Sequence, residues 1–444
     1  MAIRVSSNQM IYNYKKQLND ANARQDKLLE QGDGSKLHRP SDDSVAYTKY
    51  LRYDTSQQEN EQYQENVSTG VSWMKASDAA LVSMTDIQTT FKEKTVAAAN
   101  GDKTNEDMAA IGKEMMAEIQ QLVSLGNTQQ GDRYLFAGQK DTTQPFSLSD
   151  NTVQRGLAKT LSEKASNYFS GDDGAETMGT VRQMLTLTGS DRNTYYLNTR
   201  DGYIYTKDFV ENGYKQKTAS NANAVVDPTA DSVGKLDGWG GSSDVSKYFK
   251  NTGEIINTKQ TAMNATGSAA GTTFTFTTIE QQIATYQGDS KHISMTKKNG
   301  TTEPTSDTVN VTGQEIWGTD IFDDEASGNA ASGTAMLNEM LTVHKQVTSA
   351  NFNWLTDDGQ TISDQAHATT VNTETKLGAR QQLYNSVATM LDNQNVLIKQ
   401  DVTDVSSVDV AALATKLMEE QTVYNMSLAL GARILPQSLA DYLS

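Results

Sequence analysis

The chain has 444 residues, no cysteine and a formal charge of −17, from 38 basic and 55 acidic side chains. A chain of this length is expected to fold as two or three domains. The missing cysteines exclude disulfides and thiolate chemistry. The acidic balance argues against a nucleic-acid partner, because nucleic-acid phosphates are bound by clustered Lys and Arg. We expect no membrane segment and no cleaved signal peptide, since no apolar run is long enough for either.

The beginning of the chain predicts one long helix from residue 3 to about residue 30. Its apolar residues recur near seven-residue spacing and form a narrow seam. At 1.5 Å per residue the helix spans roughly 40 Å, more than one globular core usually needs. The predicted seam residues, with a small one between them, are Met10, Tyr14, Leu18, Ala21 and Leu28.

A second helix is expected after Gly32-Asp-Gly34 and Pro40. Ser41 is its predicted N-cap, and Asp42 and Asp43 lie in the first turn, where negative charge suits the helix dipole. We interpret these three residues as a capping motif and not as metal ligands. Residues 44–130 continue with helical periodicity, interrupted by a turn at Asn100-Gly101.

The middle of the chain, residues 147–330, predicts a β-rich insert. Short β-type runs at 195–197, 203–205, 274–276 and 309–311 are separated by Gly, Asn, Asp and Ser. We also expect a short helix over residues 175–188 and a loop over residues 218–245. Before the insert, residues 133–138 form an apolar, strand-like run.

Helical periodicity returns from about residue 331, with a turn expected at residues 356–359. Ser406 and Asp409 give a capping signal for the last helix. Its apolar stripe comprises Val410, Leu413, Leu417, Tyr424 and Leu428. Four further apolar residues leave the end of this helix without a clean polar face: Val423, Met426, Leu430 and Ile434. A helix that is apolar on all sides must be buried by something, and other copies of the chain are the simplest partner.

No pattern in the chain indicates catalysis, a cofactor or a metal site. The four histidines are scattered and never stand at the spacing that puts two imidazoles on one helix face. The insert contains no nucleophile or phosphate-binding motif. A binding or adhesive role for the insert is therefore favoured over an enzymatic one, and no catalytic residue is predicted.

Five motifs in the same order resemble the hook-associated protein 3 family of the flagellin superfamily. They are Leu37-His-Arg-Pro-Ser-Asp-Asp43, Arg133-Tyr-Leu-Phe-Ala-Gly138 with Pro145-Phe146, Tyr286-Gln-Gly-Asp289 with residues 309–313, Gly378-Ala-Arg380, and Leu435-Pro-Gln-Ser-Leu-Ala-Asp-Tyr-Leu443. The resemblance covers about residues 1–146 and 280–444. It departs after Arg380, where Gln-Gln-Leu-Tyr stands in place of the more usual Asn and Asp.

The resemblance implies a mainly α protein with paired terminal helices, a helical bundle and an outward β-rich domain. Residues 1–40 and 401–444 would form the inner layer, residues 41–146 and 331–400 a helical rod, and residues 147–330 the outer insert. It also implies a ring of identical subunits between hook-associated protein 1 and flagellin, located outside the cell at the hook–filament junction. Export as an unfolded chain, with a flagellar export chaperone on the last helix, is implied as well.

The sequence is compatible with two other functions. Flagellin itself shares the paired terminal helices, although flagellins carry a different motif where this chain has Pro40-Ser-Asp-Asp43. A non-flagellar secreted helical bundle with an adhesive β domain would show similar apolar seams.

Overall fold

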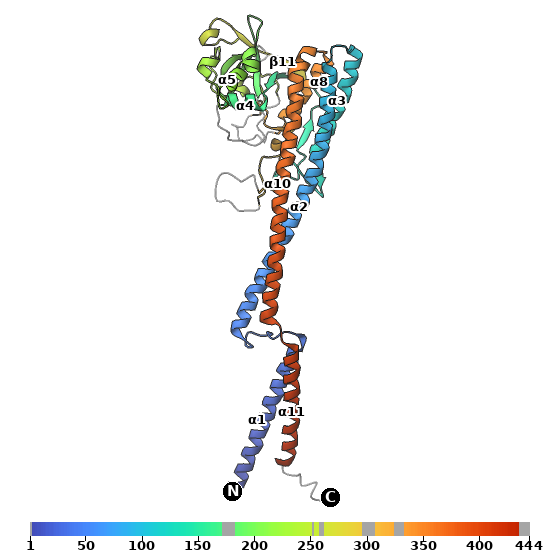
Figure 1. Cartoon of the computed structure of the whole chain (residues 1–444), viewed down its shortest axis with the longest axis vertical. Helices are drawn as coiled ribbons and strands as arrows, with labels where there is room; N and C mark the ends of the chain where they lie inside the picture. The colour runs from blue at the N-terminus through green and yellow to red at the C-terminus, as the bar shows by residue number, and fades with distance from the viewer. Residues whose placement is uncertain are drawn as a thin grey trace. The chain divides into compact units, whose positions relative to one another are not determined.

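Long helices occupy the two ends of the chain and short strands its middle (Figure 1). The computed structural model describes residues 2–170, 183–250, 253–256, 262–294, 307–323 and 333–434. This arrangement confirms the expected fold class, mainly α with a β-rich central insert and paired terminal helices. By contact density the chain divides into two compact units, residues 1–68 with 386–444, and residues 69–385.

The longer helices are α1 (Ala2–Glu30), α2 (Ser44–Ala99), α3 (Asn105–Gly126), α8 (Ala335–Thr348), α10 (Gln360–Ser406) and α11 (Val410–Ile434). The shorter ones are α4 (Glu163–Ser170), α5 (Tyr214–Ser220), α6 (Pro228–Asp231), α7 (Gly313–Trp317) and α9 (Phe352–Trp354). Two π-helical turns, η2 (Phe209–Gly213) and η6 (Leu355–Gly359), lead directly into α5 and α10. The turn expected at residues 356–359 is therefore wrong, because the chain continues there as helix.

The strands are β1 (Gln129–Gln130), β2 (Arg133–Tyr134), β3 (Phe146–Leu148), β4 (Val153–Gly156), β5 (Ala158–Thr160), β6 (Gln183–Gly189), β7 (Thr194–Leu197), β8 (Tyr203–Thr206), β9 (Gly234–Lys235), β10 (Phe274–Phe276), β11 (Thr278–Gln281) and β12 (Ala284–Tyr286). The main sheet has the order β10-β6-β7-β8-β9, and β5 also pairs with β6. All of its pairings are antiparallel. The pairs β1-β2, β3-β12 and β4-β11 form separate two-stranded ladders.

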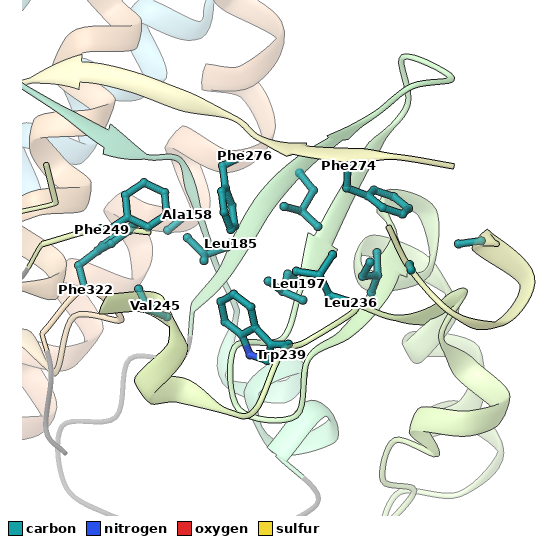
Figure 2. Packing of buried hydrophobic residues seen from close by; sticks show 14 residues of the cluster. Ala158, Leu185, Leu197, Leu236, Trp239, Val245, Phe249, Phe274, Phe276 and Phe322 are labelled. Carbon is teal, nitrogen blue, oxygen red and sulfur yellow. The ribbon is translucent and has the colours of Figure 1, made fainter. Parts of the chain in front are cut away.

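Alternating side chains of the main sheet enter two different cores. Leu185 and Leu197 point into one core with Trp239, Phe274 and other apolar residues, as Figure 2 shows. Their strand neighbours Met184 and Tyr196 enter a second core against α4 and α5. A sheet buried on both faces lacks the apolar–polar alternation of a half-exposed sheet, so sequence periodicity marks its strands only weakly.

Two expectations for the insert are wrong. Residues 183–188, for which the sequence predicted the end of a helix, lie in β6, which pairs with three other strands of the sheet; residues 175–182 lie outside the described part. Residues 218–245 are not a surface loop, because Leu236 and Trp239 are buried in the first core. The Trp239 indole N–H donates to the Thr199 carbonyl over 2.8 Å, which holds this segment against the sheet.

The helices of the second unit pack around small polar contacts as well as apolar ones. Between α2 and α10, the Ser363 and Thr95 hydroxyls are 3.0 Å apart and buried, and Met74, Leu81 and Phe91 are buried on α2. On α10, Ile362 and Ala366 are buried near its start, and Leu377, Tyr384 and Leu391 are buried at seven-residue spacing, the last of them in the first unit. A second set of apolar residues has the same seven-residue spacing but starts one residue earlier, and it is exposed: Leu383, Met390 and Leu397.

A buried charge network joins the insert to α8. The Arg155 guanidinium on β4 lies 2.5 Å from the Asp320 carboxylate and 3.9 Å from that of Glu339, and all three side chains are almost fully buried. The Gln183 side-chain amide donates to Glu339 over 2.7 Å. Burial raises the pKa of Glu339 to about 8, although Arg155 opposes this shift. A neutral Glu339 leaves Arg155 and Asp320 as a balanced pair.

We predict that Glu339 makes the stability of the fold fall as the pH rises. Its folded pKa is raised, so the stabilisation is complete below the unfolded value and is lost as the pH rises through about 8. The loss is on the order of 1 kcal/mol per pH unit in this window. Glu339→Gln should flatten the pH dependence measured by chemical denaturation between about pH 5 and 8. The exposed carboxyl of Glu114 provides the control, and an equal flattening by Glu114→Gln would refute the assignment.

Candidate assembly surface

The two ends of the chain form an antiparallel helix pair, α1 with α11 (Figure 1). The Arg24 guanidinium lies 2.9 Å from the Glu420 carboxylate across the pair. Nearer the chain ends, Gly431 lies against the Tyr14 ring, and a Cβ at that position would collide with the ring. The glycine thus lets the two helices approach closely where a large aromatic side chain lies between them.

The predicted seam is only partly used by this pairing. Leu413 is buried, together with the small residue Ala21. Five predicted seam residues are half-buried: Tyr14, Leu18, Leu28, Leu417 and Tyr424. The remaining three are exposed: Met10, Val410 and Leu428. One helix cannot cover the whole apolar surface of the other.

A second apolar stripe on α11 is solvent-exposed. Val423, Met426 and Leu430 are spaced three and four residues apart, which places them on one helix face. Their exposed fractions are 45%, 66% and 53%. The fourth residue predicted for this group, Ile434, has its side chain outside the described part of the chain. We call Val423, Met426 and Leu430 the outer stripe of α11.

The capping motif differs in detail from the prediction. Asp43 is the N-cap of α2, because its carboxylate accepts from the backbone N–H groups of Val45 and Ala46, both over 3.0 Å. Ser41 lies in the preceding turn and is not the cap. Asp42 closes that turn by accepting from the Arg39 N–H over 3.0 Å and pairs with Lys27 of α1 over 3.1 Å.

The linkers that follow α1 and precede α11 are joined to each other. Ser35 and Ser407 form an antiparallel bridge. The Lys36 N–H donates to the Ser406 carbonyl over 2.8 Å, and the Val408 N–H donates to the Gly34 carbonyl over 3.0 Å. Asp409, as predicted, caps α11 by accepting from the Ala411 and Ala412 N–H groups. Sequence reasoning missed this joint, because no local pattern signals a bridge between such distant residues.

Three of the five motifs that carried the family resemblance make packing contacts inside the second unit; residues 37–43 belong to the first unit, and residues 435–443 lie outside the described part of the chain. The Arg380 guanidinium lies 2.5 Å from the Glu315 carboxylate, with both side chains buried. The Tyr286 hydroxyl donates to the Phe136 carbonyl over 2.8 Å. Phe146 packs edge-on against Trp317, with 4.7 Å between ring centroids. These residues dock the segment around 309–317 onto α10 and α3.

Neither a metal site nor a membrane span is found in the described part of the chain. No group of three or more His, Asp or Glu side chains there could hold a metal ion. The described helices also fall short of the length and apolar character that crossing a bilayer requires.

Comparison with known proteins matches the same two regions. Residues 5–141 match the bacterial flagellin N-terminal helical region, and residues 361–443 match the bacterial flagellin C-terminal helical region. The chain thus has the paired terminal regions of flagellin-type proteins.

Among curated proteins, the chain is similar to flagellar hook-associated protein 3 of Escherichia coli and of Salmonella typhimurium. It is 31% identical to the first over 115 residues, covering 26% of this chain and 36% of the relative. It is 29% identical to the second over 146 residues, covering 32% of this chain and 46% of the relative. The match thus spans less than half the length of these relatives. The predicted resemblance to flagellar hook-associated protein 3 is confirmed.

Two solved structures are among those matched. FlgL of Bacillus cereus is 13% identical, with 79% of this chain and 99% of that chain covered and a TM-score of 0.37. The flagellar junction protein FlgL of Legionella pneumophila is also 13% identical, with 81% and 100% covered and a TM-score of 0.34. Scores of this size do not support transfer of structural detail between the chains.

We predict that a charge in the outer stripe weakens self-association. In Met426→Asp, the mostly exposed side chain can be replaced without unfolding the pair, but a contact buried in an assembly would lose roughly 1.5–3 kcal/mol. Sedimentation velocity at increasing protein concentration should show association weakened about tenfold or more. Asn425→Asp adds the same charge beside the stripe and should behave as the wild type. Equal effects of both variants would argue against a specific stripe contact.

Proposed function

We propose that this protein is a structural subunit of the bacterial flagellum that forms the junction ring between hook-associated protein 1 and the flagellin filament. The observation that supports this most is the outer stripe of α11, which remains exposed after α11 has paired with α1. An exposed apolar helix face on an acidic chain is unfavourable unless a partner covers it. Both flagellin-type terminal regions make an identical subunit the natural partner.

The assembly follows from which surfaces remain uncovered. In the proposal, residues 1–40 and 401–444 form an inner layer in which the half-buried seam of one subunit continues into that of the next. Residues 41–146 and 331–400 form the surrounding rod layer, and the insert 147–330 faces outward. Repetition of the same lateral contact closes a ring, because a heterologous interface with a suitable rotation returns to its start.

The two faces of such a ring have different partners. One contacts hook-associated protein 1 and the other contacts flagellin, so that the subunit adapts one lattice to the next. Before assembly, an export chaperone would cover Val423, Met426, Leu430 and Ile434, since these apolar residues otherwise promote aggregation. The location outside the cell, after export without a cleaved signal peptide, belongs to the same proposal.

The protein is proposed to be non-catalytic. Its relatives are structural flagellar proteins, and the strongest buried charge contacts of the described residues are between elements of the fold. Arg380 with Glu315 and Arg155 with Asp320 are ion pairs between elements of the fold. Arg380 with Glu315 joins the rod to the insert, and Arg155 with Asp320 lies within the insert and close to Glu339 of α8.

Immunogold electron microscopy of intact flagella, with antibody against the insert, tests the proposed position. We expect one band of label where the hook meets the filament. Label along the whole filament would identify the chain as a flagellin. A flagellum without label, while the protein is recovered elsewhere outside the cell, would favour the secreted helical bundle. Flagella from a strain lacking the gene provide the control.

A further inference from the structure

The insert also contacts the beginning of α10 through a lysine and an aspartate. Lys159 lies on β5 of the main sheet and Asp358 in the π-helical turn that leads into α10. The Lys159 ammonium is in direct contact with the Asp358 carboxylate. The side chains are only 8% and 12% exposed. The nitrogen of Lys159 and the carboxyl carbon of Asp358, which could react as nucleophile and electrophile, are thus held close together in a site with little access to water.

Further groups surround this pair. A carboxylate oxygen of Glu211, on η2, lies 3.7 Å from the Lys159 nitrogen, and that side chain is 19% exposed. The Tyr196 ring has its centroid 6.0 Å from the same nitrogen, and its hydroxyl donates to Glu211 over 3.4 Å. Asp357 lies 3.9 Å away and is the most exposed member of the group.

A lysine–aspartate pair on the surface of the insert provides a comparison. Lys217 and Asp231 are also in direct contact, but the Lys217 side chain is 44% exposed. No second carboxylate is found within ion-pairing distance of Lys217 among the described residues. Burial and the adjacent Glu211 therefore distinguish the Lys159 site from an ordinary surface ion pair.

We propose that Lys159 and Asp358 form an intramolecular isopeptide bond, with Glu211 as the group that carries the proton. A proton first passes from the Lys159 ammonium through the Glu211 carboxylate to the Asp358 carboxylate, and the neutral amine then attacks Cγ of the protonated Asp358. A new N–C bond forms, a proton from the nitrogen passes through Glu211 to a hydroxyl of the tetrahedral intermediate, and that hydroxyl leaves as water when its C–O bond breaks. The net reaction converts one ammonium and one carboxylate into an amide and one water, and no other reactant is required.

The surroundings favour attack on Asp358, whereas they oppose deprotonation of Lys159: burial lowers its pKa, but Asp358, Asp357 and Glu211 raise it by more. Burial raises the pKa of the Asp358 carboxyl and that of the Glu211 carboxyl. A larger fraction of Asp358 is then in the protonated form that an amine can attack, and a larger fraction of Glu211 can donate a proton. Holding two reacting groups in a fixed geometry is equivalent to raising their effective concentration to the order of 10⁵–10⁸ M. Formation of the amide also removes two charges whose burial is unfavourable.

The bond would join the outer insert to the helical rod covalently. A structural protein without cysteine has no disulfides with which to do this. The cross-link closes a loop of about 200 residues that contains the whole main sheet, and loop closure restricts the unfolded chain. The insert would then remain attached to α10 under conditions that separate non-covalent contacts.

The test is the intact mass of the purified, folded full chain under denaturing conditions. We expect a mass lower by one water than the sequence mass, and a proteolytic fragment that joins the peptides of Lys159 and Asp358. Asp358 precedes Gly359, and a succinimide at that step would also lose one water. A succinimide stays within one peptide and is opened by hydroxylamine, whereas the isopeptide withstands it.

Variants separate the bond from the fold. Lys159→Arg keeps the charge but lacks the attacking amine, so its full mass should be retained. Glu211→Gln should fold and show the cross-link slowed at least tenfold during refolding. Lys217→Arg is the matched control and should cross-link like the wild type. Full mass in the folded wild type, with separate peptides for the two residues, would overturn the proposal and leave the proposed flagellar position untouched.

Discussion

The structure depends on how much apolar surface two long helices can bury against each other. A pair such as α1 and α11 shares one seam, and the rest of each helix faces outward. Leu413 and Ala21 are buried in the seam, whereas Val423, Met426 and Leu430 are not covered by α1 and remain exposed. The same limit applies on α10, where Leu377, Tyr384 and Leu391 are buried and Leu383, Met390 and Leu397 are not. In the proposed assembly, neighbouring copies of the chain would cover these exposed faces.

The insert is held differently, by buried charges that join it to the helices. Arg155 with Asp320, Lys159 with Asp358 and Arg380 with Glu315 each connect residues that are far apart in the sequence. Removing one partner of such a pair leaves an uncompensated buried charge and is strongly destabilising. These pairs therefore fix how the sheet and the segment around residues 309–317 dock on the helices. Apolar packing supplies most of the stability, and the charges make the docking specific.

The sequence was sufficient for the parts of the fold that depend on local pattern. The span of α1, the break after Ala99 and the Asp409 cap follow from periodicity and from Gly, Asn and Asp at helix ends. It was insufficient where tertiary contacts decide. On α10 two apolar stripes are offset by one residue, so seven-residue spacing identifies the helix but not its buried face. Strand β6 looked helical because both of its faces are buried, and Asp358 looked like a turn residue because its partner Lys159 lies far away. The outer stripe was predicted from composition alone, since a helix that is apolar on all sides needs more than one neighbour.

The central claim is that the terminal helices gain most of their stability from neighbouring subunits. Hydrogen exchange tests it most directly, by comparing α1 and α11 in dilute monomer with the same helices in the proposed assembly. We predict rapid exchange of residues 9–30 and 410–431 in the monomer, while the buried α2 segment from Met74 to Phe91 is protected, and strong protection of all three in the assembly. Protection of the terminal helices in dilute monomer equal to that of the α2 segment would contradict the account, because their partner would then lie within the same chain.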